Sequence, residues 1–370
     1  MESKKLDTLI RGKNLNFLIG SGASVPLYPS LSFGEGYPTF EEVVSHPSIS
    51  KNAKVFMYVF YFMNWIEPMS INDKVNRESD VYKQYDSLIT WFYNYLQTES
   101  NDKPKRINVF TTNYDLLFER TFDEFLLKNQ LIYFNDGSRG VFKKYVSNKN
   151  YYLNVSHSGY NDNYKREVPT INLFKLHGSI SWELKEENIM VTEVNSNIKS
   201  IRDLVNSKLT RKDIEEKIYS LKDKNIYKFV LNLNCLTEEL DLGSEFYNSF
   251  DENYSKLAII NPNKYKFAKT VSEQHYYQLI RSFSYELEKK QSVLIIFGFS
   301  FADEHIQDIF ERSLLNPELQ VYLISYSKEG QDLQKNKFGG YKNINFLPKN
   351  FDVNQGDFNY LLHILGGNNE

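Results

Sequence analysis

Four short stretches of the sequence place small, polar or titratable side chains directly after apolar runs that are typical of buried β-strands. They are Gly20–Ser24 after "NLNFLI", Thr111–Asp115 after "RINVF", His177-Gly178 after "TINLFKL", and Gly298–Ser300 after "SVLIIF". In an open parallel sheet the carboxyl ends of the strands meet at one edge, and ligands bind there. The four stretches are therefore predicted to converge on one cleft.

The first stretch, Gly20-Ser21-Gly22-Ala23-Ser24, has the composition of a loop that lets a phosphate approach the backbone. One glycine permits a tight turn and the other permits close backbone contact with phosphate oxygens. The G-x-G-x-x-G fingerprint of redox dinucleotide-binding proteins is absent, and no acidic residue ends a second strand about 20 positions later. Taken alone, the stretch is equally compatible with a tight strand-to-loop turn that binds nothing.

The other stretches also have structural alternatives. Asp115 is suited to cap the helix that follows it, whereas Asn113 and Asp115 together would place an amide and a carboxylate over the cleft. A single histidine is usually structural, but His177 stands at a strand end, where a proton acceptor is useful. Ser300 can hydrogen-bond a phosphate or a ribose, and Asp303 can cap the next helix.

No metal site is expected from the sequence. Five further histidines do not follow a strand end of this kind: His46, His157, His275, His305 and His363. No two histidines have the spacing along the chain that metal ligands usually show. The one cysteine, Cys235, excludes an internal disulfide and a cysteine-based zinc knuckle, so no zinc is expected.

The elements that must position these stretches alternate between strands and helices. Strands are expected at 15–19, 106–111, 170–176, 257–262, 292–300, 320–326 and 344–348, and helices at 116–127, 270–290 and 303–315. This alternation predicts an α/β fold with a doubly wound parallel sheet. Thr39, followed by Glu41 and Glu42, predicts the N-terminus of another helix.

Two segments depart from the alternation. Residues 49–100 contain an aromatic and apolar pattern that predicts two or three packed helices, and residues 182–254 are charged and helical in part. We expect a Rossmann-like core made of residues 1–48, 101–181 and 255–370, with 49–100 and 182–254 as helical insertions. Their aromatic side chains suit an oligomer or partner interface, and packing into a core explains them equally well.

Composition excludes several classes of function. The chain has 370 residues, of which 41% are hydrophobic and 25% charged, and its formal net charge is −3. This balance argues against electrostatic binding of nucleic acid or of an anionic membrane. The longest apolar-aromatic run, at 55–66, is about half as long as a membrane span. No apolar signal segment opens the sequence, so the expected location is the cytoplasm.

Taken in order, the four stretches resemble the motifs of sirtuins. The G-A-G-x-S loop of that family corresponds to Gly20–Ser24, and its T-Q-N-x-D strand end to Thr111–Asp115, with Thr112 replacing Gln. The H-G pair corresponds to His177-Gly178, and the later G-x-S loop to Gly298–Ser300. The stretch "GFSFADEHI" is especially similar to sirtuin-like domains of bacterial antiphage defence systems. The resemblance implies a sirtuin-type Rossmann-like fold that binds NAD.

Departures from the family concern the protein-deacylating sirtuins. Those enzymes usually carry a four-cysteine zinc module after the H-G pair, which one cysteine cannot form. Their P-D-F-R stretch corresponds here to Pro38-Thr39-Phe40-Glu41, with an acid in place of Arg. The resemblance therefore points to NAD hydrolysis, the activity associated with the defence branch of the family.

The resemblance also implies roles for single residues. Asp115 would hold the carboxamide of NAD, Asn113 would order the ribose and the attacking water, and His177 would accept a proton from a ribose hydroxyl. The residues expected to hold the rest of the nucleotide are Gly20, Ser21, Gly22, Ala23, Ser24, Thr111, Gly298 and Ser300.

The expected function is NAD glycohydrolase activity in a regulated, NAD-depleting effector of antiphage defence. By resemblance it would form a homo-oligomer and work with a HerA-type ATPase, without binding membrane or nucleic acid directly. One alternative is an NAD-dependent protein deacylase, which the missing zinc module disfavours. Another is a non-catalytic module that senses NAD or ADP-ribose, against which Asn113 and His177 argue. A redox dehydrogenase is disfavoured because its fingerprint is absent.

Overall fold

The computed structural model describes residues 3–29, 31, 33–70, 77–99, 105–193, 195–262 and 274–366. The start of the helix expected at 270–290 and the expected core boundary at residue 101 lie outside the described residues. From Gln274 onward the expected helix is present as α13 (Gln274–Glu288).

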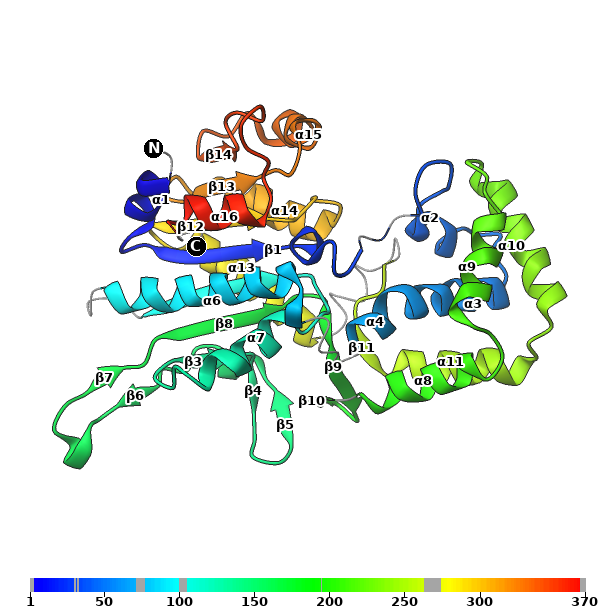
Figure 1. The fold of residues 1–370 in the computed structure, drawn as a ribbon, viewed down its shortest axis with the longest axis horizontal. Helices are drawn as coiled ribbons and strands as arrows, with labels where there is room; N and C mark the ends of the chain where they lie inside the picture. The colour runs from blue at the N-terminus through cyan, green and yellow to red at the C-terminus, as the bar shows by residue number, and fades with distance from the viewer. Residues whose placement is uncertain are drawn as a thin grey trace.

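The central sheet of the described chain contains seven parallel strands in the order β14-β13-β12-β1-β2-β8-β3 (Figure 1). The strands are β1 (Asn14–Ile19), β2 (Arg106–Thr111), β3 (Tyr133–Asn135), β8 (Thr170–Lys175), β12 (Ser292–Phe297), β13 (Gln320–Ile324) and β14 (Ile344–Leu347). The strands on the β2 side of β1 come first in the chain, where β3 occupies the edge and the later β8 lies between β2 and β3, and the strands on the β12 side follow. The doubly wound α/β fold predicted from the sequence is confirmed.

Helices cover both faces of this sheet. Alternate strand residues point to opposite sides, so apolar residues lie on both faces and must be buried there. Phe17 and Ile19 join a core with one group of helices, and Leu18 joins a core with another. The first group is α1 (Ser3–Ile10), α6 (Asp80–Thr98), α7 (Leu117–Leu126) and α16 (Phe358–Ile364). The second is α13, α14 (Glu304–Ser313) and α15 (Lys328–Phe338). The strands are buried on both faces, as parallel strands usually are.

A ladder of buried polar side chains crosses the sheet from β12 to β3. Asn16 Nδ2 donates to Ser292 Oγ (3.0 Å), and Asn108 Nδ2 donates to Asn16 Oδ1 (2.9 Å). Asn172 Nδ2 donates to Asn108 Oδ1 (2.9 Å), and Asn135 Nδ2 donates to Asn172 Oδ1 (3.0 Å). All five side chains are buried. Because a shifted strand would leave these groups unpaired, the ladder favours a single register.

A second sheet, antiparallel, extends from the carboxyl end of β8. Its order is β11-β9-β10-β5-β4, made of β4 (Ser138–Arg139), β5 (Lys144–Val146), β9 (Gly178–Lys185), β10 (Asn188–Val191) and β11 (Leu257–Ile259). One expectation was wrong here: the strand at 257–262 pairs antiparallel with β9 instead of joining the parallel sheet. Residues 182–191 lie mostly in β9 and β10, and the helical part of 182–254 begins with a helix at Ser196. A short apolar run marks a strand but does not reveal its partner.

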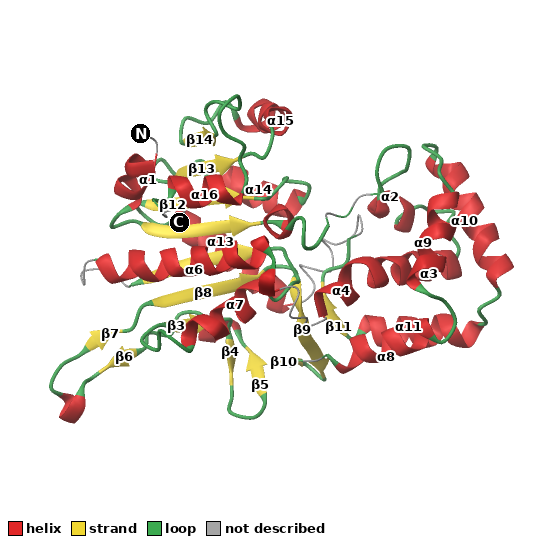
Figure 2. Ribbon diagram, in the orientation of Figure 1, coloured by secondary structure: helices red, strands yellow, loops and turns green. Residues whose placement is uncertain are grey.

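Beyond the strand ends lies a layer of helices with its own hydrophobic core (Figure 2). It contains α2 (Phe40–Val44), α3 (Lys51–Tyr61), a π-helical turn η2 (Phe62–Ile66), α4 (Glu67–Ser70), α8 (Ser196–Asn206), α9 (Arg211–Ser220), α10 (Ile226–Leu240) and α11 (Ser244–Ser255). Thr39 caps α2 in a capping box with Glu42, as the sequence predicts. The division into a core and two insertions stays a prediction. None of the described helices combines the length and apolar character that crossing a bilayer requires.

The ladder yields a stability prediction. Replacing Asn108 with alanine leaves Asn16 Oδ1 and Asn172 Nδ2 buried without their partner, so we expect a loss of about 1–3 kcal/mol for each group. Urea denaturation of the purified variant measures the loss. The matched control is Asn336→Ala on the exposed side of α15, which should change stability by less than about 0.5 kcal/mol. Equal stability of the two variants would contradict the role of the ladder.

Candidate functional site

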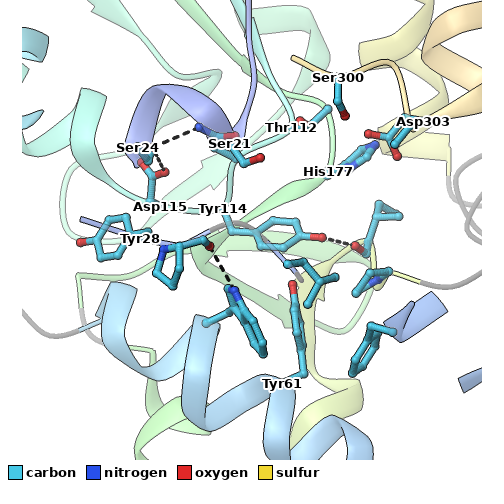
Figure 3. Close-up of a pocket in the computed structure, with 18 of the residues that line it drawn as sticks. Ser21, Ser24, Tyr28, Tyr61, Thr112, Tyr114, Asp115, His177, Ser300 and Asp303 are labelled. Atoms are coloured by element: carbon cyan, nitrogen blue, oxygen red, sulfur yellow. Dashed lines mark hydrogen bonds between the residues drawn. The ribbon is translucent and has the colours of Figure 1, made fainter. Parts of the chain in front are cut away.

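A pocket of about 410 Å³ lies at the carboxyl edge of the central sheet, where the strand order reverses beside β1 (Figure 3). On one side it is lined by residues that follow β1, β2, β8 and β12: Ser21, Ser24, Thr112, Asn113, Tyr114, Asp115, His177, Ser300, Ala302 and Asp303. On the other side it is lined by the helical layer, including Phe40, Glu41, Tyr61, Trp65 and Met69. Its volume falls in the range of about 300–1,000 Å³ typical of ligand pockets.

The structure brings most of the predicted site residues to this pocket. Its lining includes Ser21, Ser24, Asn113, Asp115, His177 and Ser300. Five other predicted residues are not part of the lining: Gly20, Gly22, Ala23, Thr111 and Gly298. The convergence of four strand ends, expected from the sequence, is therefore present.

The glycines allow the loops after β1 and β12 to touch. A Cβ on Gly20 would lie 2.4 Å from the carbonyl oxygen of Gly298, and a Cβ on Gly298, whose φ is +64°, would lie 2.5 Å from Ala23 N. Gly20 N donates to Phe297 O (3.0 Å), and Gly22 N donates to Gly298 O (2.9 Å). These amides are engaged within the protein, so the predicted contact of the glycines with a nucleotide stays a prediction.

Asn113 is fixed by hydrogen bonds that link β1 and β2. Thr111 Oγ1 donates to Ile19 O (2.8 Å) and accepts from Asn113 N (3.0 Å). Asn113 Nδ2 donates to Gly20 O (3.1 Å) and to Ser24 Oγ (3.3 Å). Asn113 Oδ1 is buried and has no hydrogen-bond partner among the described residues. A buried acceptor without a partner costs free energy, so its retention beside a pocket points to a ligand.

Asp115 is held by the same network. Ser24 Oγ donates to Asp115 Oδ2 (2.8 Å), and Leu117 N, at the start of α7, donates to Asp115 Oδ1 (3.1 Å). The N-cap residue of α7 is Leu116 rather than Asp115, which the sequence suggests for that position. The hydroxyls of Ser24 and Tyr85 lie 3.2 Å apart. Burial, followed by the charge of Asp115, holds the pKa of Tyr85 well above its ordinary value. The same two causes raise the pKa of Tyr28 to about 12, so both phenols are neutral at physiological pH.

The backbone at His177 and Gly178 is positioned by close contacts with β11. Its carbonyl accepts a hydrogen bond from Ile260 N (2.8 Å) at the end of β11. The next residue, Gly178, has φ +86°, and a Cβ there would lie 2.0 Å from Ala258 O. Only glycine therefore lets the chain turn from β8 into β9 so close to β11.

His305 is not among the site residues predicted from the sequence, and it lies against His177. The two Nε2 atoms are 3.1 Å apart, and both side chains are buried, with exposed fractions of 5% for His177 and 3% for His305. Asp303 completes a group of three in which the candidate ligand atoms lie within 4.8 Å of one another. The signal that could have found His305 is its spacing of two residues from Asp303 at the start of α14.

Aromatic side chains of the helical layer form the wall opposite the strand ends, and the sequence analysis did not predict them. Tyr61 and Trp65 stack with ring centroids 5.7 Å apart, and Trp65 Nε1 donates to Pro29 O (3.1 Å). The hydroxyl of Tyr114 donates to Ile260 O.

The charged side chains that line the pocket are acidic. They are Glu41, Asp115 and Asp303, and the described lining contains no lysine or arginine. The pocket therefore favours a ligand that contains a flat ring and carries positive charge.

Comparison with known families gives one match. A family model described as a SIR2-like domain matches residues 107–233. The match supports a sirtuin-like domain in this chain. Its range contains Asn113, Asp115 and His177, and the fold brings the loops after β1 and β12 to the same pocket. SIR2-like domains are NAD-dependent enzymes as a class, which supports an NAD-related function. No curated protein matches the chain.

The turn at Gly178 gives a second prediction. We expect Gly178→Ala to destabilise the protein by about 1–3 kcal/mol more than Gly12→Ala, because overpacking against the Ala258 carbonyl adds to the cost of a positive φ. Gly12 is a matched control: its φ is +68°, and nothing lies within 4 Å of a Cβ built there. Thermal and urea unfolding measure both variants. Equal losses would mean that contact with β11 does not fix this turn.

Proposed function

We propose that the protein hydrolyses NAD to nicotinamide and ADP-ribose in the pocket at the strand ends. The observation that supports this most directly is that Asn113 Oδ1, a buried acceptor with no hydrogen-bond partner in the described part of the chain, and the buried His177 belong to one pocket at the switch point of the sheet. Nucleotides bind at such switch points in doubly wound folds. The SIR2-like match over both residues supports NAD as the nucleotide.

The chemistry needs few groups. Nicotinamide in NAD is already a cationic leaving group, so no general acid is required to break the glycosidic bond. The transition state has oxocarbenium character at the ribose. A site that binds this state more tightly than NAD itself, and that holds a water near the anomeric carbon, accelerates the reaction. Carboxylates of Glu41, Asp115 and Asp303 around the pocket favour the developing positive charge.

The roles of Asp115 and Asn113 are assigned to side-chain oxygen atoms that can accept a further hydrogen bond. The carboxylate of Asp115 accepts one bond at each oxygen, and each oxygen can accept another from the carboxamide N–H of NAD. Asn113 Oδ1 accepts from a ribose hydroxyl or from the attacking water. His177 takes a proton from a ribose hydroxyl as general base. The proposed reaction uses no metal.

Uncharged hydrogen-bond donors would bind the remainder of the nucleotide. Because the described lining lacks lysine and arginine, hydroxyls such as those of Ser21 and Ser300 would hold the pyrophosphate. Gly20, Gly22, Ala23, Thr111 and Gly298 would act by holding the two loops together behind it. The aromatic wall of Tyr61 and Trp65 offers a surface on which a nucleotide base can stack.

The biological setting is also part of the proposal. The resemblance of "GFSFADEHI" to antiphage defence domains supports a regulated NAD-depleting effector in the cytoplasm. We further propose a homo-oligomer that works with a HerA-type ATPase, since uncontrolled depletion of NAD would be lethal to the cell. The aromatic residues of the helical layer lie largely in its own core, so the partner surface is assigned to its exposed faces.

Release of nicotinamide from NAD tests the function. We expect His177→Ala and Asn113→Ala each to lower kcat/KM by about 10²–10⁴-fold, the usual cost of losing a positioned acid–base or orienting group. His363→Ala, on an exposed position of α16, is the matched control and should retain full activity. Chromatography quantifies nicotinamide, and circular dichroism checks that each variant is folded.

Two results would contradict the proposal. Tight binding of NAD or ADP-ribose without turnover, both for the protein alone and with the proposed HerA-type ATPase, would leave a sensing module. NAD-dependent removal of acyl groups from peptides, with no hydrolysis in their absence, would leave a deacylase.

A further inference from the structure

We propose that His177, His305 and Asp303 form a binding site for one divalent transition-metal cation, such as Zn²⁺ or Co²⁺, and that the bound cation blocks NAD hydrolysis by occupying His177. The metal site stands on the geometry of the three side chains. Only the blocking of turnover rests on the proposed function.

The distances suit a shared cation. Two imidazole nitrogens that each bind a metal at about 2.0–2.1 Å lie about 3.0–3.4 Å apart, and the Nε2 atoms of His177 and His305 are 3.1 Å apart. Candidate ligand atoms of all three residues lie within 4.8 Å of one another.

Rigid elements hold the three side chains. The His177 backbone is fixed by the Ile260 amide and by the Gly178 turn. Asp303 and His305 stand at the start of α14, where Ile306 N and Gln307 N donate to Asp303 O (3.1 and 2.9 Å). The carboxylate of Asp303 makes no capping bond to the first turn of that helix and points toward His177 (Figure 3).

A hydrogen bond between the two imidazoles is the competing explanation for their contact. One ring would donate its Nε2–H to the lone pair of the other, and 3.1 Å suits that bond as well. The carboxylate of Asp303 is compatible with this bond, because it can accept from an imidazole N–H. The same carboxylate also completes a set of three metal ligands. Two histidines and one carboxylate are a ligand set for divalent first-row metals, and three protein ligands leave a coordination position open toward the pocket.

The pocket supports a cation of this class. Glu41 and Asp115 add negative charge to the lining, and its described residues include no lysine or arginine that would repel a metal. The two imidazole ligands favour Zn²⁺, Co²⁺ or Ni²⁺ over Mg²⁺ or Ca²⁺, which prefer oxygen ligands. Coordination uses the Nε2 lone pair of His177, so that nitrogen can no longer accept a proton. Metal binding at His177 and its role as a general base therefore exclude each other.

Metal binding is tested directly on the full chain, freed of metal by a chelator and carrying Cys235→Ser so that the exposed thiol cannot bind metal. Co²⁺ is titrated by its visible absorption, and Zn²⁺ by competition with a chromogenic chelator. We expect one cation per chain, and an affinity at least about tenfold lower in His305→Ala and in Asp303→Ala. His363→Ala should bind as the parent does. Absence of one-to-one binding, or unchanged affinity in His305→Ala, would overturn the site in favour of the hydrogen-bonded pair.

Competition tests the block on turnover. ADP-ribose at a concentration far above its dissociation constant should weaken Co²⁺ binding in proportion to its occupancy, and Zn²⁺ should stop nicotinamide release until a chelator is added. A metal-loaded protein that releases nicotinamide at the metal-free rate would overturn the exclusion. Stoichiometric metal binding together with no nicotinamide release under any condition would refute the proposed hydrolase and leave the metal site standing.

Discussion

The buried asparagine ladder is the constraint on which the arrangement of the pocket depends. It joins β12, β1, β2, β8 and β3 through hydrogen bonds between buried side chains. The two asparagines at its centre, Asn108 and Asn172, bond to neighbouring asparagines of the ladder. The register that it favours pairs Thr111 with Lys175, and Asn113 and His177 each follow that pair by two residues. A slip of two residues would separate the two side chains by about 7 Å along the strands. Pairing inside the sheet thus determines distances in the pocket.

The parts of the site that could be predicted from the sequence are those encoded locally. A run of apolar residues such as Phe17 to Ile19 indicates a buried strand, and a polar residue just beyond it must lie at the sheet edge, whatever the rest of the chain does. That reasoning found Asn113, Asp115 and His177. It could not find His305, which is 128 residues from His177 in the chain. It also missed Tyr61 and Trp65, whose apolar pattern is equally typical of a helix core.

Two features of the fold are not encoded locally, for the same physical reason. The glycines after β1 indicate that something approaches the backbone closely, and in the structure the loop after β12 does so, while their predicted contact with a nucleotide stays a prediction. Glycine composition reveals that something approaches the backbone but not what approaches. The strand β11 was expected in the parallel sheet and instead pairs with β9. Its hydrophobicity shows burial, while its partner depends on the chain reversal at Gly178, a contact over a long sequence separation.

The central claim is that NAD binds across the strand ends with its nicotinamide ribose between Asn113 and His177. The most direct measurement is an experimental structure of the His177→Ala protein with NAD, since slow turnover preserves the bound nucleotide. The account predicts the pyrophosphate beside Ser21 and Ser300, the carboxamide on Asp115, and a ribose hydroxyl or water on Asn113 Oδ1. NAD bound elsewhere, or a pocket that stays empty at saturating NAD, would contradict it.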